Sequence, residues 1–247
     1  MVSFIFKTEN GDFQQYLNKN IPKYCENETI IVVPEQHLFS FEQDIKKLDK
    51  NISVFSFQKL CYQIFKKYGG VAGERASRAS KISVVNLILY KLRDKLKIYG
   101  GLVYKSGFAE IILNVIEQIK NSGICEEKLS QKIEFLRDTD LKSKMNEFLQ
   151  IFREYNAYLY KFYRDSCDDI SRANKLSKEN NFFSKKEIYF EKFISFNGSQ
   201  FKFINTMLNQ TNVYFSLYYK NNEPLFEPTE FMIDRIKYMA KVIVWTK

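Results

Sequence analysis

A segment near the start of the chain lies where a nucleotide phosphate would be expected to bind, but its residues are not of the types that bind phosphate. Residues 2–6 (VSFIF) predict a short buried strand, and a helix is expected soon after it. A phosphate-binding loop at such a turn has the pattern G-x-x-x-x-G-K-[ST]. Its amides and Lys hold the phosphates, and its hydroxyl holds magnesium. The four required positions are occupied by Lys7, Asp12, Phe13 and Gln14, which predicts a degenerate nucleotide site.

Metal-binding and nucleophilic chemistry have little support in the residue types and their spacing. The cysteines are far apart and no C-x-x-C pair occurs, whereas zinc sites need close pairs of ligands. The single histidine, His37, has no identifiable Ser, Cys or Asp partner and is expected to be a turn residue. We therefore predict no metal site, no catalytic residue, and reduced cysteines in a cytoplasmic protein. The cysteines are Cys25, Cys61, Cys125 and Cys167.

The charge balance suits a nucleic-acid partner. The 247 residues include 38 Lys and Arg and 29 Asp and Glu, so the formal net charge is +9. The alternative is that the lysines are spread over solvated faces, and no run of five like charges decides between the two. No apolar stretch approaches the roughly 18–20 residues of a membrane span, so no membrane partner is expected.

Apolar periodicity predicts strands alternating with helices at both ends of the chain and only helices in the middle. Further strands are expected at 29–34, 52–57, 187–193, 212–219 and 242–245. The expected helices cover 12–20, 36–48, 59–68, 82–97, 108–121, 141–164, 168–179, 199–209 and 228–241. Short connections favour a parallel sheet, so the predicted class is α/β.

The predicted domains are an α/β domain of residues 1–77 and 185–247 and an all-helical insertion of residues 78–184. Within the insertion, residues 141–164 carry aromatic side chains at helical spacing. These could form a base-stacking platform, but the spacing favours a packed core. The stripe consists of Phe148, Phe152, Tyr155, Leu159 and Phe162.

Four segments resemble a known family. They are TIIVVPEQHLFSFEQDI, VFSFQKLCYQIFKKYGG, EIYFEKFISFNGSQFKFINTML and NVYFSLYYKNNEPLFEPTEFMIDRIKYMAK. Together they resemble a superfamily 1 helicase core with its helical insertion. They are more closely similar to the N-terminal part of the B subunit of the bacterial AddAB-type helicase–nuclease, called RexB in some lineages. The resemblance implies a RecA-like, P-loop NTPase-type sheet, an A subunit as heterodimer partner, and single- and double-stranded DNA ends in recombinational repair.

The chain departs from this family at its nucleotide site. The family commonly keeps a glycine run after the first strand, and this chain lacks it. Glu191 matches the family's Walker-B-like Asp, but Lys192 follows where a hydrolysing helicase carries a second carboxylate. We therefore predict no ATP hydrolysis and weak or no ATP binding. The alternative for Glu191 is an acid at a strand end, partly neutralised by Lys192.

Cofactors of the family are implied to lie elsewhere in the full-length protein. The resemblance places an iron–sulfur cluster and Mg in a C-terminal nuclease domain, and we expect neither in this chain. Full-length proteins of the family are several times longer than 247 residues, so the chain is interpreted as an N-terminal fragment or a truncated reading frame.

Four residues are candidates for binding DNA by position in the resemblance. Gln36 matches the Gln of the PEQ turn, Phe57 and Lys59 match an aromatic and a basic residue, and Phe196 matches a second aromatic. An amide pairs with a base edge, a ring stacks on an unpaired base, and Lys neutralises a phosphate. Gln36 could equally be a turn residue and Phe57 a core residue. Leu38 stands where a hydroxyl residue is common in the family, which weakens sequence-specific reading.

These observations favour a non-catalytic, helicase-like module for single-stranded DNA binding, scanning for the recombination signal Chi, and subunit scaffolding. One alternative is an ATP-binding or hydrolysing helicase subunit with an unorthodox nucleotide site. Another is a purely structural or decayed remnant.

Overall fold

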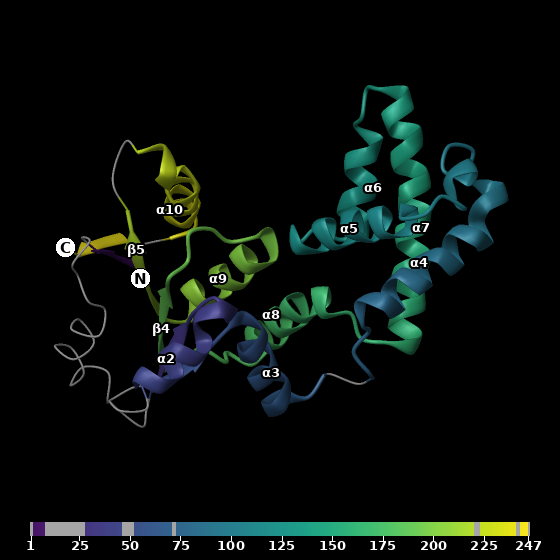
Figure 1. The fold of residues 1–247 in the computed structure, drawn as a ribbon. Helices are drawn as coiled ribbons and strands as arrows, with labels where there is room; N and C mark the ends of the chain where they lie inside the picture. The colour runs from purple at the N-terminus through teal and green to yellow at the C-terminus, as the bar shows by residue number, and fades with distance from the viewer. Residues whose placement is uncertain are drawn as a thin grey trace. The chain divides into compact units, whose positions relative to one another are not determined.

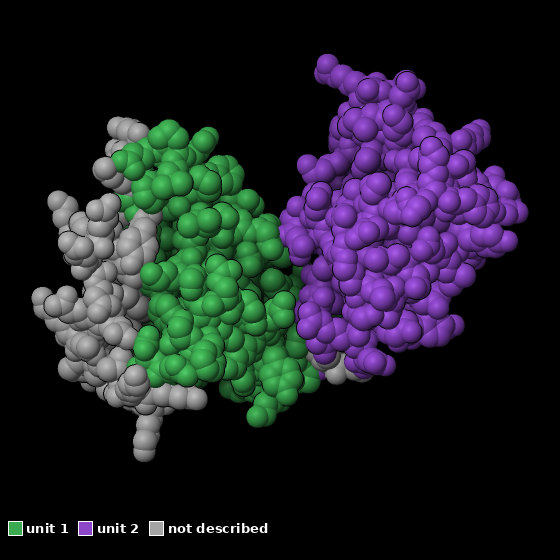
Figure 2. Space-filling model, in the orientation of Figure 1, with its two compact units in different colours: residues 1–69, 170–247 green, residues 70–169 purple. Residues whose placement is uncertain are grey.

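The computed structural model of the chain describes residues 2–7, 28–45, 52–70, 73–219, 223–240 and 243–246. The chain forms two compact units, here called the sheet unit (residues 1–69 and 170–247) and the helical unit (residues 70–169) (Figures 1 and 2). The boundaries expected from the sequence, 77/78 and 184/185, differ from these, and the domain assignment stays a prediction. The helix expected at 12–20 lies outside the described residues.

Six described strands form one sheet in the sheet unit. They are Val2–Lys7 (β1), Glu28–Val32 (β2), Ile52–Phe55 (β3), Lys186–Glu191 (β4), Asn212–Tyr218 (β5) and Ile243–Thr246 (β6). The strand order is β3-β2-β4-β5-β1-β6, and every neighbouring pair is parallel. The predicted α/β fold, a parallel sheet interrupted by helices in the sequence, is therefore confirmed.

Strand β2 shows why these segments pair as they do. Its residues from Thr29 to Val32 are all buried, which is typical of parallel strands covered on both faces. Strand β3 ends two residues earlier than predicted because Ser56 caps the next helix. The Ser56 hydroxyl accepts a hydrogen bond from the Lys59 backbone N–H at 3.2 Å. Strand β4 also ends two residues early, at Glu191, and Lys192 follows in the left-handed region with a φ of 64°.

The remaining elements of the sheet unit are helices and short turns. The α-helices are α2 (Leu38–Ile45), α3 (Phe57–Tyr68), α8 (Asp169–Glu179), α9 (Gly198–Gln210) and α10 (Glu227–Met239). Two 3-10 turns, Glu35–His37 and Pro224–Phe226, precede α2 and α10. Helix α3 ends where the Gly69 N–H donates to the Phe65 carbonyl at 2.7 Å, and the φ of 73° at Gly69 is one that glycine adopts without strain.

The helical unit packs one apolar face of each of its helices into a common core. Its helices are α4 (Arg78–Leu92), α5 (Phe108–Asn121), α6 (Glu126–Glu134) and α7 (Thr139–Phe162), with 3-10 turns at Arg93–Lys95, Gly100–Leu102 and Ser166–Asp168 (Figure 1). Helix α6 was not among the helices expected from the sequence. No helix in the described ranges has the length and apolar character that crossing a membrane requires.

The aromatic stripe of α7 lies mostly in this core. Phe148, Phe152, Tyr155 and Leu159 are each at most 2% exposed. Phe162, at the end of the helix, is 52% exposed and is the exception. Helical spacing therefore indicated core packing correctly along most of α7, and the rings inside the core are unavailable to a nucleic-acid base.

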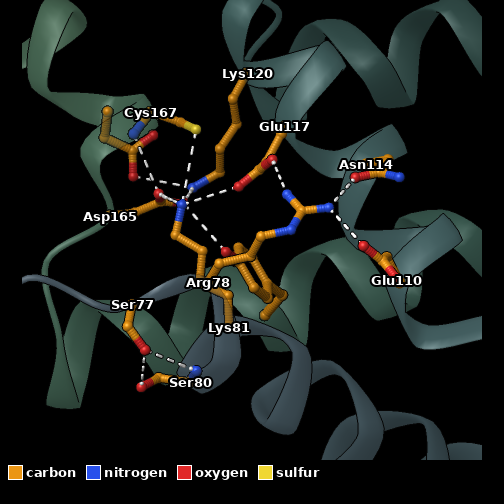
Figure 3. A network of polar contacts seen from close by, with 12 residues as sticks. Ser77, Arg78, Ser80, Lys81, Glu110, Asn114, Glu117, Lys120, Asp165 and Cys167 are labelled. Carbon is orange, nitrogen blue, oxygen red and sulfur yellow. Dashed lines mark hydrogen bonds and ion pairs between the residues drawn. The ribbon is translucent and has the colours of Figure 1, made fainter. Parts of the chain in front are cut away.

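A buried carboxylate joins three parts of the helical unit (Figure 3). Asp165 follows α7 and is 1% exposed. Its Oδ1 lies 2.8 Å from Lys81 Nζ of α4, and its Oδ2 lies 2.9 Å from Lys120 Nζ of α5. The Tyr155 hydroxyl donates to Oδ2 at 3.3 Å, and the Cys167 backbone N–H donates to Oδ1 at 3.1 Å. One carboxylate thus ties α4, α5 and α7 to the segment that leaves the unit.

Backbone hydrogen bonds join the same segment to the chain that enters the unit. The Arg164 N–H donates to the Glu74 carbonyl at 2.8 Å, and the Ala76 N–H donates to the Arg164 carbonyl at 3.0 Å. The network also extends along α5, where Glu117 lies 3.0 Å from Lys81 Nζ. The entry and exit of the helical unit therefore share backbone and ionic contacts.

The charges in this network are set by burial and by their neighbours. Burial acts to raise the pKa of Asp165, but the ammonium groups of Lys120 and Lys81 lower it to about 2. Burial acts to lower the pKa of Lys81, but the hydrogen bond and charge of Asp165, together with Cys167 and Glu117, outweigh burial and leave the pKa raised. Burial raises the pKa of the Cys167 thiol to about 12. Asp165 and Lys81 are therefore charged and the thiol is protonated at physiological pH.

We predict that Asp165→Asn destabilises the chain because it leaves Lys81 and Lys120 buried without the carboxylate they share. The expected loss at neutral pH is about 3–5 kcal/mol of unfolding free energy, measured by urea denaturation. The folded pKa of Asp165, about 2, lies below its ordinary value of 3.8. Its stabilisation is therefore present above about pH 4 and lost as the pH falls from about 4 towards 2. The variant should lack this acid-dependent loss.

Asp168→Asn is the matched control for this prediction. The Asp168 side chain is 35% exposed and lies 2.9 Å from the same Lys120 Nζ, but within the described network it does not contact Lys81. We expect the substitution to cost less than about 1 kcal/mol, because solvent reaches the Asp168 carboxylate and Lys120 keeps its ion pair with Asp165. Equal losses in the two variants would contradict a special role for Asp165.

Candidate nucleic-acid interface

The carboxyl ends of three neighbouring strands bring the candidate DNA-binding residues to one edge of the sheet. Val32 at the end of β2 pairs in register with Phe55 of β3 and Phe190 of β4. The segments that follow these strands therefore start side by side. They carry Gln36, then Phe57 with Lys59, then Phe196. In open α/β sheets this edge is where ligands bind.

Phe57 is a core residue at this edge, which is one of the two alternatives that the sequence left open. It begins α3 rather than ending a strand, and it is 6% exposed. Its ring centroid lies 5.8 Å from that of Phe190, 5.7 Å from that of Phe193 and 6.1 Å from that of Phe196. A base could stack on Phe57 only after these rings had separated, which would cost the cluster its apolar contacts.

Phe196 is also buried, at 8% exposure, for a reason that its local sequence explains. Asn197 caps α9, and a capping box links it to Gln200. The Gln200 N–H donates to the Asn197 side chain, and the Asn197 N–H donates to the Gln200 side chain, each at 2.9 Å. Phe196 then packs against Phe201 with ring centroids 5.6 Å apart, as in a hydrophobic staple. The pattern F-N-x-x-Q-F is the local sequence signal of this burial.

Gln36 and Lys59 are the two candidates with solvent-accessible side chains. Gln36 is exposed in the turn Glu35–His37. Lys59 has a side chain 39% exposed, ion-paired with Glu42 of α2, and its Nζ lies 5.9 Å from the ring centroid of Phe55. His37 lies in the same turn as Gln36, where its N–H donates to the Pro34 carbonyl at 2.9 Å. The sequence did not foresee the Glu42 pair, because 17 residues separate the partners.

Glu191 is fully buried at the end of β4. Strand β5 lies between β4 and β1 in the sheet. In register Glu191 faces Ser216 of β5, whose hydroxyl is also buried. Lys192 beyond it is exposed. Of the other predicted positions, Lys7 ends β1, and Asp12, Phe13 and Gln14 lie outside the described residues. Within the described ranges, no three His, Cys, Asp or Glu side chains are grouped as metal ligands.

The helical unit contains a cavity of about 390 Å³ beside the Asp165 network. Its charged lining consists of Arg75, Arg78, Lys81 and Glu117, and Glu117 lies within ion-pair distance of Arg78 and Lys81. Glu117 partly neutralises these cations, and the neighbouring Cys167 thiol is protonated. The cavity therefore has the features of a structural ion-pair network rather than those of a catalytic centre.

Comparison with known proteins identifies the family. The family model described as "ADDB, N-terminal" matches residues 13–243. A curated relative from Clostridium acetobutylicum, named as the B subunit of an ATP-dependent helicase/deoxyribonuclease, is 27% identical over 236 residues, covering 91% of this chain and 20% of the relative. The same-named protein of Clostridium novyi is 24% identical over 236 residues, covering 91% of this chain and 21% of the relative.

A third relative has the same name and a similar extent of match. The protein of Clostridium botulinum strain Loch Maree is 27% identical over 215 residues, covering 83% of this chain and 19% of the relative. The chain therefore spans about a fifth of the length of these relatives. Because the family model matches residues 13–243 of the 247, the chain belongs to the AddB N-terminal family.

Proposed function

We propose that this chain is the helicase-like N-terminal module of the B subunit of an ATP-dependent helicase/deoxyribonuclease, and that it binds single-stranded DNA without hydrolysing ATP. The observation that carries the proposal is the family match over residues 13–243. An A subunit as heterodimer partner, DNA ends, Chi scanning in recombinational repair and a cytoplasmic location are parts of the same proposal. They rest on the name of the relatives and on the resemblance.

The sheet edge offers Gln36 and Lys59 as the groups that meet DNA. The Gln36 amide is exposed and has the donor and acceptor that a base edge requires. Lys59 is held by Glu42 in a solvent-accessible ion pair, and such pairs contribute only about 0–1 kcal/mol. A DNA phosphate can therefore replace Glu42 at little cost. Binding should then depend strongly on salt.

The burial of Phe57 and Phe196 assigns these rings a supporting role in the proposal. They hold the segments after β3 and β4 in place. We propose that a base stacks instead on an exposed ring close to Gln36 in the sequence. Phe39 is 71% exposed and follows Gln36 by three residues, a spacing that brings side chains to neighbouring positions on a helical turn. Gln36, Phe39 and Lys59 together form the proposed DNA-contacting set.

We predict opposite effects of two substitutions in one ion pair. Lys59→Ala removes a phosphate contact and should weaken binding of oligo-dT, with a salt slope smaller by about 0.7. Glu42→Gln releases Lys59 from its partner and should strengthen binding at low salt. Fluorescence anisotropy over a salt series measures both. Lys175→Ala, at an exposed lysine of α8, is the matched control and should change neither quantity. Weakening by both substitutions would argue against Lys59 as a phosphate ligand.

We also predict that the chain neither hydrolyses ATP nor gains stability from it. Glu191 is a single buried acid at the strand end, and Lys7, Asp12, Phe13 and Gln14 replace the phosphate-binding residues. Millimolar ATP with magnesium should leave the melting temperature unchanged, and Glu191→Gln should not alter that response. Phosphate release stimulated by single-stranded DNA, and abolished by Glu191→Gln, would establish the ATPase alternative instead.

A further inference from the structure

Two exposed tyrosines and an arginine form a compact cluster at the end of α4. Tyr90 is 57% exposed and Tyr104 is 71% exposed. The Arg93 guanidinium lies 5.1 Å from the ring centroid of Tyr90, and its Nη1 donates to the Tyr104 hydroxyl at 2.7 Å. The two ring centroids are 6.5 Å apart, with an interplanar angle of 78°. We call the surface formed by residues 87–105 the Tyr90–Tyr104 face.

Helix α7 fixes the backbone that carries this face through hydrogen bonds. The buried Glu147 carboxylate accepts hydrogen bonds from the N–H groups of Ile98 and Tyr99, each at 2.9 Å. A Cβ on Gly100 would lie 2.5 Å from the Arg93 carbonyl oxygen, so the turn requires glycine there. The rings are therefore presented by an ordered turn. Stacking of a ligand on these rings therefore costs the protein little further conformational entropy.

Positive charge is concentrated on the same face. Residues 87–105 contain five Lys and Arg and one Asp, so their net charge is 5 − 1 = +4, out of +9 for all 247 residues. The only acid among them, Asp94, pairs with Arg93 at 3.2 Å. From α7, Glu154 pairs with Lys91 at 3.2 Å, and Glu147 is buried behind the turn. The exposed cations that remain are Lys95, Lys97 and Lys105.

We propose that the Tyr90–Tyr104 face binds single-stranded nucleic acid. Unpaired bases stack on the exposed rings of Tyr90 and Tyr104, and Lys95, Lys97 and Lys105 contact the phosphates. Aromatic rings set among cations match alternating bases and phosphates, whereas the base faces of a duplex are hidden. The face belongs to the helical unit and shares no residue with the proposed set at the sheet edge. It is therefore a second site, and photo-crosslinking to its tyrosines distinguishes it from the set that contains Lys59.

The test measures anisotropy of a fluorescein-labelled oligo-dT with the full chain and with Tyr90→Ala/Tyr104→Ala. We expect this variant to bind at least about tenfold more weakly, because each lost ring removes a stacking contact. Tyr90→Phe/Tyr104→Phe keeps the rings and should bind within about twofold of the unsubstituted chain. Lys95→Ala/Lys97→Ala should lower the salt slope by about 1.4, which is 0.7 for each lost phosphate contact.

Tyr160→Ala/Tyr238→Ala is the matched control, because these tyrosines are 86% and 92% exposed and lie outside the face. It should bind like the unsubstituted chain. Photo-crosslinking of 5-iodouracil oligonucleotides should yield adducts at Tyr90 or Tyr104. The proposal is overturned if Tyr90→Ala/Tyr104→Ala binds normally, if Tyr160→Ala/Tyr238→Ala loses as much affinity as Tyr90→Ala/Tyr104→Ala, or if adducts form only at other residues. The proposal is also overturned if duplex DNA binds as tightly as oligo-dT and if Tyr90→Ala/Tyr104→Ala leaves the duplex affinity unchanged.

Discussion

The helical unit depends on one geometric constraint, which is that the chain must leave it close to where it entered. Asp165 satisfies this constraint by accepting from Lys81 of α4 and Lys120 of α5 at once. Backbone bonds between Arg164 and the residues around Ala76 join the same two segments. Buried charges of this kind cost desolvation and are stable only when every partner is present. The same arrangement makes the network a structural clamp rather than a reactive group.

In the sheet unit the corresponding constraint is the parallel pairing of β4 between β2 and β5. This pairing brings the segment after β4 beside those after β2 and β3, although more than 100 residues separate β3 and β4 in the sequence. The aromatic cluster around Phe57 fills the space where these segments meet. It orders the edge while leaving Gln36 and Lys59 accessible. The residues that shape the edge and those that can reach a ligand are therefore different ones.

The distribution of charge has consequences for both units. Within most ion pairs of the Asp165 network the two opposite charges neutralise each other, and Lys59 is likewise paired with Glu42. By contrast, Lys95, Lys97 and Lys105 lie exposed among residues 87–105, which also carry two exposed rings. The location of unpaired positive charge is therefore a better indicator of a nucleic-acid site than the total charge of the chain, because paired lysines contribute little to the attraction of a polyanion.

The sequence by itself determined the α/β class, the helical middle of the chain and the family, because apolar periodicity and a few segments such as PEQ carry that information locally. The pattern F-N-x-x-Q-F is a local signal of the staple of Phe196 on Phe201, although the resemblance led us to expect Phe196 to contact DNA. Only the tertiary structure decided the strand order, the burial of Phe57, the Lys59–Glu42 pair and the meeting of Tyr90 with Tyr104 through Arg93. The physical reason is that periodicity reports which face of an element is buried. It does not report which distant residue will pack or pair against that face.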